Sequence, residues 1–254
     1  MPAALYLVPV PLGDGADPQA HLPPATVSVI CRLDCFVAEN AKSARAVLRR
    51  LPMGRPLQAL EIRELNQHTP PALLPELLGP LRAGRPLGLM SEAGCPAVAD
   101  PGAALVQLAH REQLPVMPLI GPSALLLALM VSGMNGQSFA FTGYLPVDPA
   151  ARRAAIQELL ARSRRFGQTQ LMIETPYRNQ ALLDALLEAL PDDAHLAVAA
   201  SLSLPEQWVR SAPAAQWRAH AATLPRAPAV FLLQAAASAA GPLSATAAAR
   251  KKRR

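Results

Sequence analysis

The sequence predicts an α/β protein whose first half forms a parallel sheet covered by helices on both faces. Short apolar runs alternate with stretches of helical spacing throughout residues 1–120, which is typical of strand–helix–strand units. These runs are apolar at consecutive positions, as expected for parallel strands buried on both faces. Helix-breaking residues at 132–136 then separate this half from a second α/β unit.

The individual elements follow from these patterns in chain order. In the first half, strands are expected at 5–10, 35–38, 57–62, 85–90 and 115–119, and helices at 24–31, 42–51, 71–83, 102–111 and from 124. The second half opens at 139, and strands are expected there at 170–174, 195–200, 208–210 and 230–233, with helices at 152–165 and up to 190. We therefore expect a first domain over 1–120, a linker and helix over 121–138, a second domain over 139–234, and an Ala-rich, basic, disordered tail over 235–254.

The composition favours a soluble, cytoplasmic protein that has no membrane partner. Hydrophobic residues make up 51% of the chain and aromatic residues 4%, so the core is expected to be aliphatic. No apolar run reaches the roughly 20 residues that span a bilayer, and the proline-broken first residues do not resemble a signal peptide. The net charge is +6, but Arg250–Arg254 supplies five of these charges, so the rest of the chain carries about +1. This basic run is either a solvated terminus or a contact for nucleic acid.

The three cysteines, Cys31, Cys35 and Cys95, do not predict a disulfide framework, because their number is odd. Cys31 and Cys35 have neither a second cysteine pair nor a nearby histidine to complete a zinc site. We expect both to be small core residues, and we expect no metal.

The stretch from Gly88 to Gly102 is the most informative part of the chain. It joins a predicted strand to a predicted helix through far more glycine, proline and carboxylate residues than a simple turn needs. Asp100 is expected to cap the helix, with Pro101 in its first turn. In open α/β sheets ligands bind beyond the carboxyl ends of the strands, where this loop lies.

Three Gly/Pro-rich loops, at 11–15, 91–102 and 121–123, are expected at that same edge of the sheet. The first lacks the third glycine of a dinucleotide fingerprint, and no Walker lysine is present, so a phosphate cradle is not expected. Backbone groups and small side chains suit a flat, zwitterionic ligand without phosphates. S-adenosylmethionine has this character.

Several motifs occur in one order along the chain. They are Leu5–Gly13, Ala38–Asn40, Ser91–Pro96 with Asp100–Gly102, Gly121–Ala124, Gly143–Pro146 and Ile173–Arg178. In this order the sequence resembles the tetrapyrrole-methylase superfamily of S-adenosylmethionine-dependent methyltransferases. Within it, the sequence is most similar to the branch that methylates the ribose 2′-hydroxyl of a cytidine in small-subunit ribosomal RNA.

This resemblance implies two αβα domains with mostly parallel or mixed sheets, a cofactor cleft between them, and a homodimer. It also implies the cofactor-binding residues, which are Pro11, Gly94, Cys95, Pro96, Ala97, Ser123, Glu174, Ala199 and Pro228. The sequence departs from the ribosomal-RNA branch on the substrate side. For example, Ala38-Glu-Asn-Ala-Lys42 stands where that branch typically has Ala-Glu-Asp-Thr-Arg.

A sugar hydroxyl is a poor nucleophile that benefits from a nearby base. Glu39, Glu92 and Glu174 are the candidate catalytic residues, and we expect Glu39 to face the substrate most directly. The candidate substrate-binding residues are polar or cationic and follow predicted strands: Asn40, Lys42, His68, Tyr177 and Arg178. Each could instead be a helix cap, an ion-pair partner or a surface residue.

Three functions remain open on the sequence. The first is a ribose methyltransferase whose partner is ribosomal RNA or the small ribosomal subunit. The second is a small-molecule methyltransferase acting on a tetrapyrrole or a similar acidic ring. The third is a non-catalytic RNA-binding protein that keeps the fold as a relic.

Overall fold

The chain folds as two units, Met1–Ala124 and a second unit that begins at Leu125. The computed structural model describes residues 1–13, 15–220 and 222–236. Most of the expected tail, residues 237–254, therefore lies outside the described residues. The boundary at Ala124 assigns most of the expected linker region, 121–138, to the second unit.

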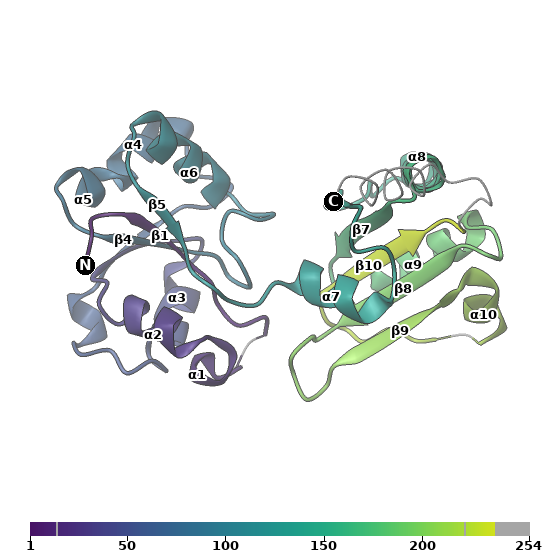
Figure 1. Ribbon diagram of the computed structural model, residues 1–254, viewed down its shortest axis with the longest axis horizontal. Helices are drawn as coiled ribbons and strands as arrows, with labels where there is room; N and C mark the ends of the chain where they lie inside the picture. The colour runs from purple at the N-terminus through teal and green to yellow at the C-terminus, as the bar shows by residue number, and fades with distance from the viewer. Residues whose placement is uncertain (14, 221, 237–254) are drawn as a thin grey trace, which may run out of the picture. The chain divides into compact units, whose positions relative to one another are not determined.

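A five-stranded sheet forms the centre of the first unit (Figure 1). Its strands run in the order β3 (Glu61–Glu64), β2 (Cys35–Ala38), β4 (Leu87–Met90), β1 (Leu5–Val8) and β5 (Val116–Pro118). All neighbouring pairs are parallel. The predicted parallel sheet is confirmed, and the carboxyl ends of all five strands meet at one edge.

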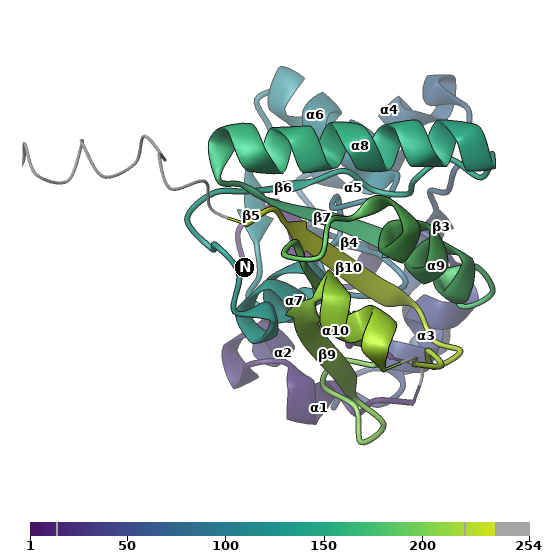
Figure 2. The same ribbon diagram turned by 90° about the vertical axis from the view of Figure 1, so that its right-hand side faces the viewer.

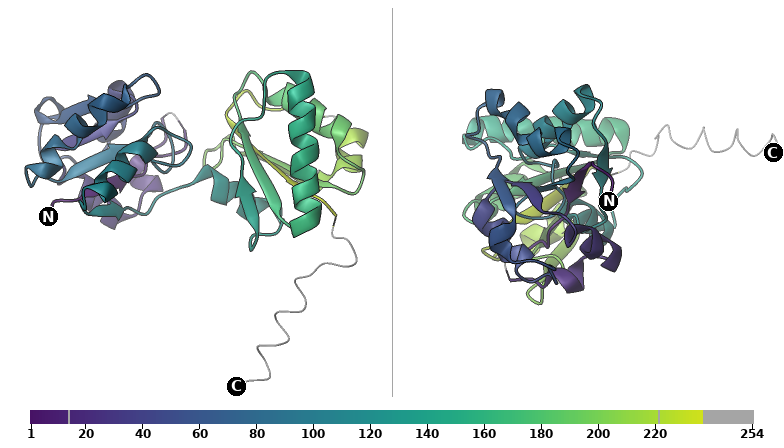
Figure 3. Two further views of the ribbon diagram at one scale, coloured as in Figure 1. Left: turned by 90° about the horizontal axis from the view of Figure 1, so that it is seen from above. Right: turned by 90° about the vertical axis from the view of Figure 1, so that its left-hand side faces the viewer.

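Helices cover both faces of this sheet (Figure 1), and Figure 3 gives two further views of the same elements. On one face lie α1 (Pro18–His21), α2 (Pro24–Ile30) and α3 (Ala41–Leu48), where Ile30 and Leu48 pack against Tyr6, Phe36 and Met90. On the other lie α4 (Leu74–Leu77), α5 (Gly79–Arg82) and α6 (Gly102–Arg111), where Leu78 and Leu105 pack against Leu5, Val37 and Leu89. Side chains at alternate positions along each strand thus pack into the two hydrophobic cores on opposite faces of the sheet.

Two sequence predictions in this unit are wrong. Residues 57–62 do not form one strand, because Leu57–Ala59 is a 3-10 turn (η1) and β3 begins only at Glu61. The helix expected at 71–83 is broken into η2 (Pro71–Leu73), α4 and α5. Pro75 and Pro80 lie in the first turns of α4 and α5, since proline cannot donate the hydrogen bond that a helix interior requires.

The second unit is built on a mixed sheet. Its order is β6 (Phe139–Phe141), β7 (Thr169–Glu174), β10 (Ala229–Gln234), β8 (His195–Ala200) and β9 (Trp208–Pro213). Only β6 and β7 are parallel, and the other pairs are antiparallel. A parallel sheet followed by a mixed one confirms the predicted α/β class.

Three helices of this unit, α8 (Pro149–Phe166), α9 (Asn179–Ala189) and α10 (Ala214–Ala219), share one core (Figure 2). Ile156, Leu183 and Trp217 meet Met172 and Phe231 of the sheet there. A fourth helix, α7 (Ala124–Ser132), precedes β6. No helix among the described residues combines the length and apolar character needed to cross a membrane. Ala235, expected in the disordered tail, is instead buried, and its backbone N–H donates to Ser163 Oγ at 2.8 Å.

Candidate functional site

The carboxyl edge of the first sheet gathers the loops that the sequence singled out. Because the strands are parallel, the segments after β1, β4 and β5 all leave at this edge. Val10 and Gly94 exchange backbone hydrogen bonds of 2.9 and 3.1 Å, which joins the loop after β1 to the loop after β4. Six of the expected cofactor residues lie in these three loops: Pro11, Gly94, Cys95, Pro96, Ala97 and Ser123.

Asp100 holds the loop after β4 in its curled shape. Its Oδ1 accepts hydrogen bonds from the backbone N–H groups of Ala97 at 2.9 Å and Gly102 at 2.7 Å. The loop contains two non-glycine residues with positive φ, Ala97 at 65° and Ala99 at 64°, which is a costly conformation for alanine. The helix cap itself is Pro101, not the expected Asp100, although the Asp100 carboxylate still accepts from the first helical amide.

The second carboxylate oxygen of Asp100, Oδ2, differs from the first in its surroundings. Oδ2 is buried and has no hydrogen-bond partner among the described residues. Burial raises the pKa of this carboxyl, although the amides of Gly102 and Ala97 act in the opposite direction. Sequence reasoning treated Asp100 only as a cap, because the motif does not reveal an unpartnered oxygen.

A close backbone approach fixes the loop after β5. A Cβ atom on Gly121 would lie 2.3 Å from Cβ and Cγ of Pro9, so only glycine fits at this position. Thr26 Oγ1 donates to the carbonyl of Ile120 at 2.8 Å, and Cys95 Sγ lies 3.4 Å from the carbonyl oxygen of Pro122. Backbone hydrogen bonds thus join the loops after β1 and β4, and side-chain contacts from Pro9, Thr26 and Cys95 hold the loop after β5.

Glu39 and Glu92, two of the candidate catalytic residues, meet at this edge. Glu39 follows β2, and its Oε2 accepts from the backbone N–H of Glu92 at 3.4 Å. Glu92 Oε1 in turn accepts from Ser43 Oγ at 2.9 Å. The pKa of Glu39 is raised above the ordinary value for glutamate, chiefly by burial and also by the negative charges of Glu92 and Asp100, while the Glu92 amide lowers it. The surroundings of Glu39 therefore favour the protonated form of its carboxyl more than water does.

The candidate substrate residues of this unit lie around the same edge. Asn40 caps α3, because its Oδ1 accepts from the backbone N–H groups of Lys42 at 2.9 Å and Ser43 at 3.2 Å. Lys42 is exposed in the first turn of this helix. His68 is exposed in the loop after β3, where its backbone N–H donates to Asn66 Oδ1 at 3.0 Å. Asn40 thus has a structural role, whereas Lys42 presents its ammonium group to solvent.

Glu174, the third candidate catalytic residue, is buried in the second unit at the end of β7. One carboxylate oxygen lies 2.7 Å from Arg178 Nη2, and the other accepts from the Thr175 backbone N–H at 2.7 Å. Arg178 also donates to the Leu145 carbonyl at 3.0 Å. Tyr177, which directly precedes Arg178 in the chain, is 92% exposed. Both oxygens of Glu174 are therefore engaged within its own unit.

The remaining expected cofactor residues, Ala199 and Pro228, lie at the same end of this sheet as Glu174, on β8 and directly before β10. Strand register pairs Ala229 with both Glu174 and Ala200, and Val230 with Ala199. Asn179 Nδ2 donates to the carbonyls of Ala227 at 2.7 Å and Pro225 at 3.3 Å, which fixes the segment before β10. Sequence reasoning missed Asn179, which is buried at the start of α9. Its position directly after the Thr-Pro-Tyr-Arg motif was the available signal.

The cysteines and the acidic residues do not form a metal centre among the described residues, where no cluster of three or more potential ligands occurs. All three cysteines are free. Cys35 is buried, and Cys31 and Cys95 are partly buried. Burial raises the pKa of the Cys95 thiol, so the thiol form is favoured.

Comparison with known proteins gives the following matches. The family described as Tetrapyrrole (Corrin/Porphyrin) Methylases matches residues 4–217. A protein named ribosomal RNA small subunit methyltransferase I from Xylella fastidiosa is 37% identical over 62% of this chain and 55% of its own length. The protein of the same name from Mesorhizobium japonicum is 32% identical over 79% of this chain and 64% of its own length.

A solved structure shares the fold. The uroporphyrin-III-C-methyltransferase of Thermus thermophilus aligns with a TM-score of 0.54 at 20% identity, covering 91% of both chains. The chain thus spans 55% and 64% of the length of the two relatives described above.

Proposed function

Since this chain belongs to the tetrapyrrole (corrin/porphyrin) methylase family, we propose that it is an S-adenosylmethionine-dependent methyltransferase acting on small-subunit ribosomal RNA. The acceptor we propose is the ribose 2′-hydroxyl of a cytidine. Relatives named ribosomal RNA small subunit methyltransferase I support the choice of substrate. The observation that carries the proposal is the meeting of Glu39 with the loop after β4 at the carboxyl edge of a parallel sheet.

The residues at this edge fit the proposed cofactor. The negative charges of Glu92 and Asp100 both act on Glu39, so the edge favours a ligand that carries positive charge. S-adenosylmethionine supplies a methyl group on a positively charged sulfonium and carries an ammonium group. The segments Pro9–Gly13, Gly94–Ala97 and Gly121–Ser123 would hold it, largely through backbone atoms, because close approach there excludes larger side chains. In the second unit, the residues we propose for cofactor binding are Glu174, Ala199 and Pro228, at one end of its sheet.

Glu39 is the proposed base. S-adenosylmethionine would supply the methyl group from its sulfonium and leave as the neutral thioether. The Glu39 carboxylate would take the proton of the ribose hydroxyl that accepts the methyl group. The raised pKa of Glu39 makes it a stronger base than an ordinary glutamate. Alignment of the hydroxyl with the methyl carbon supplies most of the remaining acceleration, since correct positioning can lower the barrier by roughly 7–11 kcal/mol.

We also propose that the protein works as a homodimer in the cytoplasm, where ribosomal subunits are found. Analytical ultracentrifugation of the full chain measures the first of these points. A sedimentation coefficient that corresponds to a single chain at micromolar concentration would contradict the dimer.

The central experiment measures transfer of labelled methyl from S-adenosylmethionine to small ribosomal subunits from cells that lack this protein. The expected result is label on one cytidine ribose, together with cofactor binding in calorimetry. Label on a porphyrin or corrin but not on subunits would identify a small-molecule methyltransferase instead. Absence of cofactor binding would identify a non-catalytic relic.

A further inference from the structure

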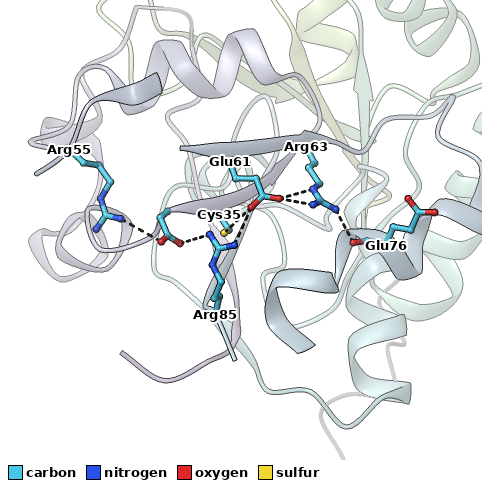
Figure 4. Close-up of polar contacts among 7 residues, drawn as sticks. Cys35, Arg55, Glu61, Arg63, Glu76 and Arg85 are labelled. Atoms are coloured by element: carbon cyan, nitrogen blue, oxygen red, sulfur yellow. Dashed lines mark hydrogen bonds and ion pairs between the residues drawn. The ribbon is translucent and has the colours of Figure 1, made fainter. Parts of the chain in front are cut away.

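The cations of the first unit differ in whether the fold neutralises them. At the amino edge of the sheet, Arg85 lies 3.5 Å from Asp34 and 3.3 Å from Glu61 (Figure 4). Arg63 lies 2.7 Å from Glu61, and Arg55 lies 3.6 Å from Asp34. These arginines are held in a network with two carboxylates, and much of their charge is neutralised inside the protein.

The cations of α3 have no such partners in the described chain. The helix contains no acidic residue, and among the described residues no carboxylate forms an ion pair with Lys42, Arg45 or Arg49. The guanidinium of Arg45 donates to the carbonyl of Ala41, at 3.5 Å. Lys42, Arg45 and Arg49 are all exposed.

These three residues form one ridge. Their spacing of three and then four residues sets them on the same side of the helix, which continues in helical conformation to its cap at Arg49. A different side of the helix carries Ala44 and Leu48 into the core. With a rise of about 1.5 Å per residue, the ridge extends over roughly 10 Å.

The ridge starts at the candidate site and leads away from it. Asn40, the cap of α3, directly follows Glu39, and Ser43 in the first turn donates to Glu92. A strand of nucleic acid whose sugar lies at Glu39 would therefore have its neighbouring phosphates within reach of Lys42 first and then of the two arginines.

We propose that Lys42, Arg45 and Arg49 bind consecutive phosphates of the RNA strand that flanks the methylated nucleotide. The inference rests on the proposed function, and it assigns α3 as the surface that positions the substrate. The charge is exposed, outside the ion pairs of the described chain and adjacent to the site, as phosphate contacts require. None of the large hydrophobic residues exposed in the described chain lies on α3, so this helix lacks the apolar side that membrane-surface helices insert.

The test uses the full chain with the double substitution Arg45→Gln and Arg49→Gln. The matched control is Arg164→Gln with Arg165→Gln, which removes two exposed arginines from the last turn of α8 that form no ion pair with any described residue. The affinity of each protein for a fluorescently labelled, cytidine-containing single-stranded RNA is measured between 50 and 200 mM salt, on the order of the range where such binding is sensitive.

Loss of two phosphate contacts is expected to reduce the slope of log K against log salt by about 1.4 and to weaken binding about 20-fold at 0.1 M salt. S-adenosylmethionine affinity, measured by calorimetry, stays the same. A slope equal to that of the unsubstituted protein, or an equal loss in the control, would overturn the proposal.

Methyl transfer to small subunits separates this inference from the proposed function. Suppose that the unsubstituted protein transfers methyl and the α3 variant has an unaltered slope of log K against log salt. That result would refute only the role of the ridge in RNA binding. A ridge-dependent slope in a protein that binds the cofactor but transfers no methyl to subunits would refute only the proposed reaction.

Discussion

Glu174 and Arg178 form an ion pair across the turn that follows β7, with the carboxylate 1% and the guanidinium side chain 30% exposed. Removing the cation alone leaves a buried negative charge, which costs far more than the pair contributes. We expect Arg178→Met to lower the free energy of unfolding by about 3 kcal/mol. Urea denaturation measures this, and Glu174→Gln combined with Arg178→Met should recover most of the loss. Equal stability of the single and double variants would contradict the assignment.

Substitution of Glu39 tests its role as the base. We expect Glu39→Gln to reduce kcat for methyl transfer by about 100-fold or more, because proton transfer to a positioned base typically contributes that much. The raised pKa of Glu39 further predicts that kcat falls on acidification at a pH above the ordinary glutamate value of 4.5. A rate profile from pH 4 to 8.5 checks both points. Turnover within a few-fold of the unsubstituted enzyme would exclude Glu39 as the base.

Although Glu39→Gln is expected to lower activity, we expect it to raise stability at neutral and alkaline pH. Because its pKa is higher in the folded than in the unfolded protein, the folded state binds the proton more tightly. This contribution to stability is lost as the pH rises from the unfolded pKa of Glu39 through the folded one, and Glu39→Gln lacks it at every pH. We expect the variant to have the higher Tm at pH 8 and no such advantage at pH 4. A lower Tm at pH 8 would show that the carboxylate stabilises the fold.

The alanine and asparagine variants of Asp100 are expected to differ in cofactor affinity. Asp100→Ala removes the acceptor for two backbone amides and should cost about 2 kcal/mol of folding stability. It should also weaken S-adenosylmethionine binding about tenfold or more, since the loop would lose its shape. Asp100→Asn keeps one acceptor oxygen and serves as the control, with affinity near that of the unsubstituted protein. Calorimetry gives the affinities, and equal affinity of all three proteins would remove Asp100 from the site.

Adding a side chain at Gly121 is expected to destabilise the fold by steric overlap. In Gly121→Ala the new methyl group would overlap Pro9, so the loop after β5 must shift, at a cost of about 1–3 kcal/mol. Gly54→Ala is the matched control, because no described atom lies within 4 Å of the place its new Cβ would take and its φ is not in the left-handed region. Thermal unfolding compares the two. A Tm for Gly121→Ala equal to that of Gly54→Ala would show that the contact is easily relieved.

The sequence predicted best what depends on local pattern and burial. The strands at Leu5–Val8, Cys35–Ala38 and Leu87–Met90 are buried at every position except Leu7, which is partly buried, so apolar runs identified them. The edge strand β3 was misplaced, because its last residues, Arg63 and Glu64, are exposed and break the apolar pattern. The pattern of 57–62 could not distinguish a 3-10 turn packed through Leu57 and Leu60 from a strand.

Contacts between distant residues could not be read from the sequence. The hydrogen bond from the Glu92 amide to Glu39 joins residues that are 53 positions apart. The loops themselves were predictable, because glycine and proline mark them, but the pairing of Val10 with Gly94 was not. Asn179 and the second carboxylate oxygen of Asp100 become visible only when the surrounding burial is known.

The two outer strands of the first sheet have a consequence for how the protein behaves at high concentration. β5 ends in Pro118, which has no N–H to offer a further strand, and β3 carries the charges of Arg63 and Glu64. Neither border is a good template for edge-to-edge pairing with another molecule. This α/β unit is therefore expected to resist aggregation even though the three inner strands of its sheet are apolar.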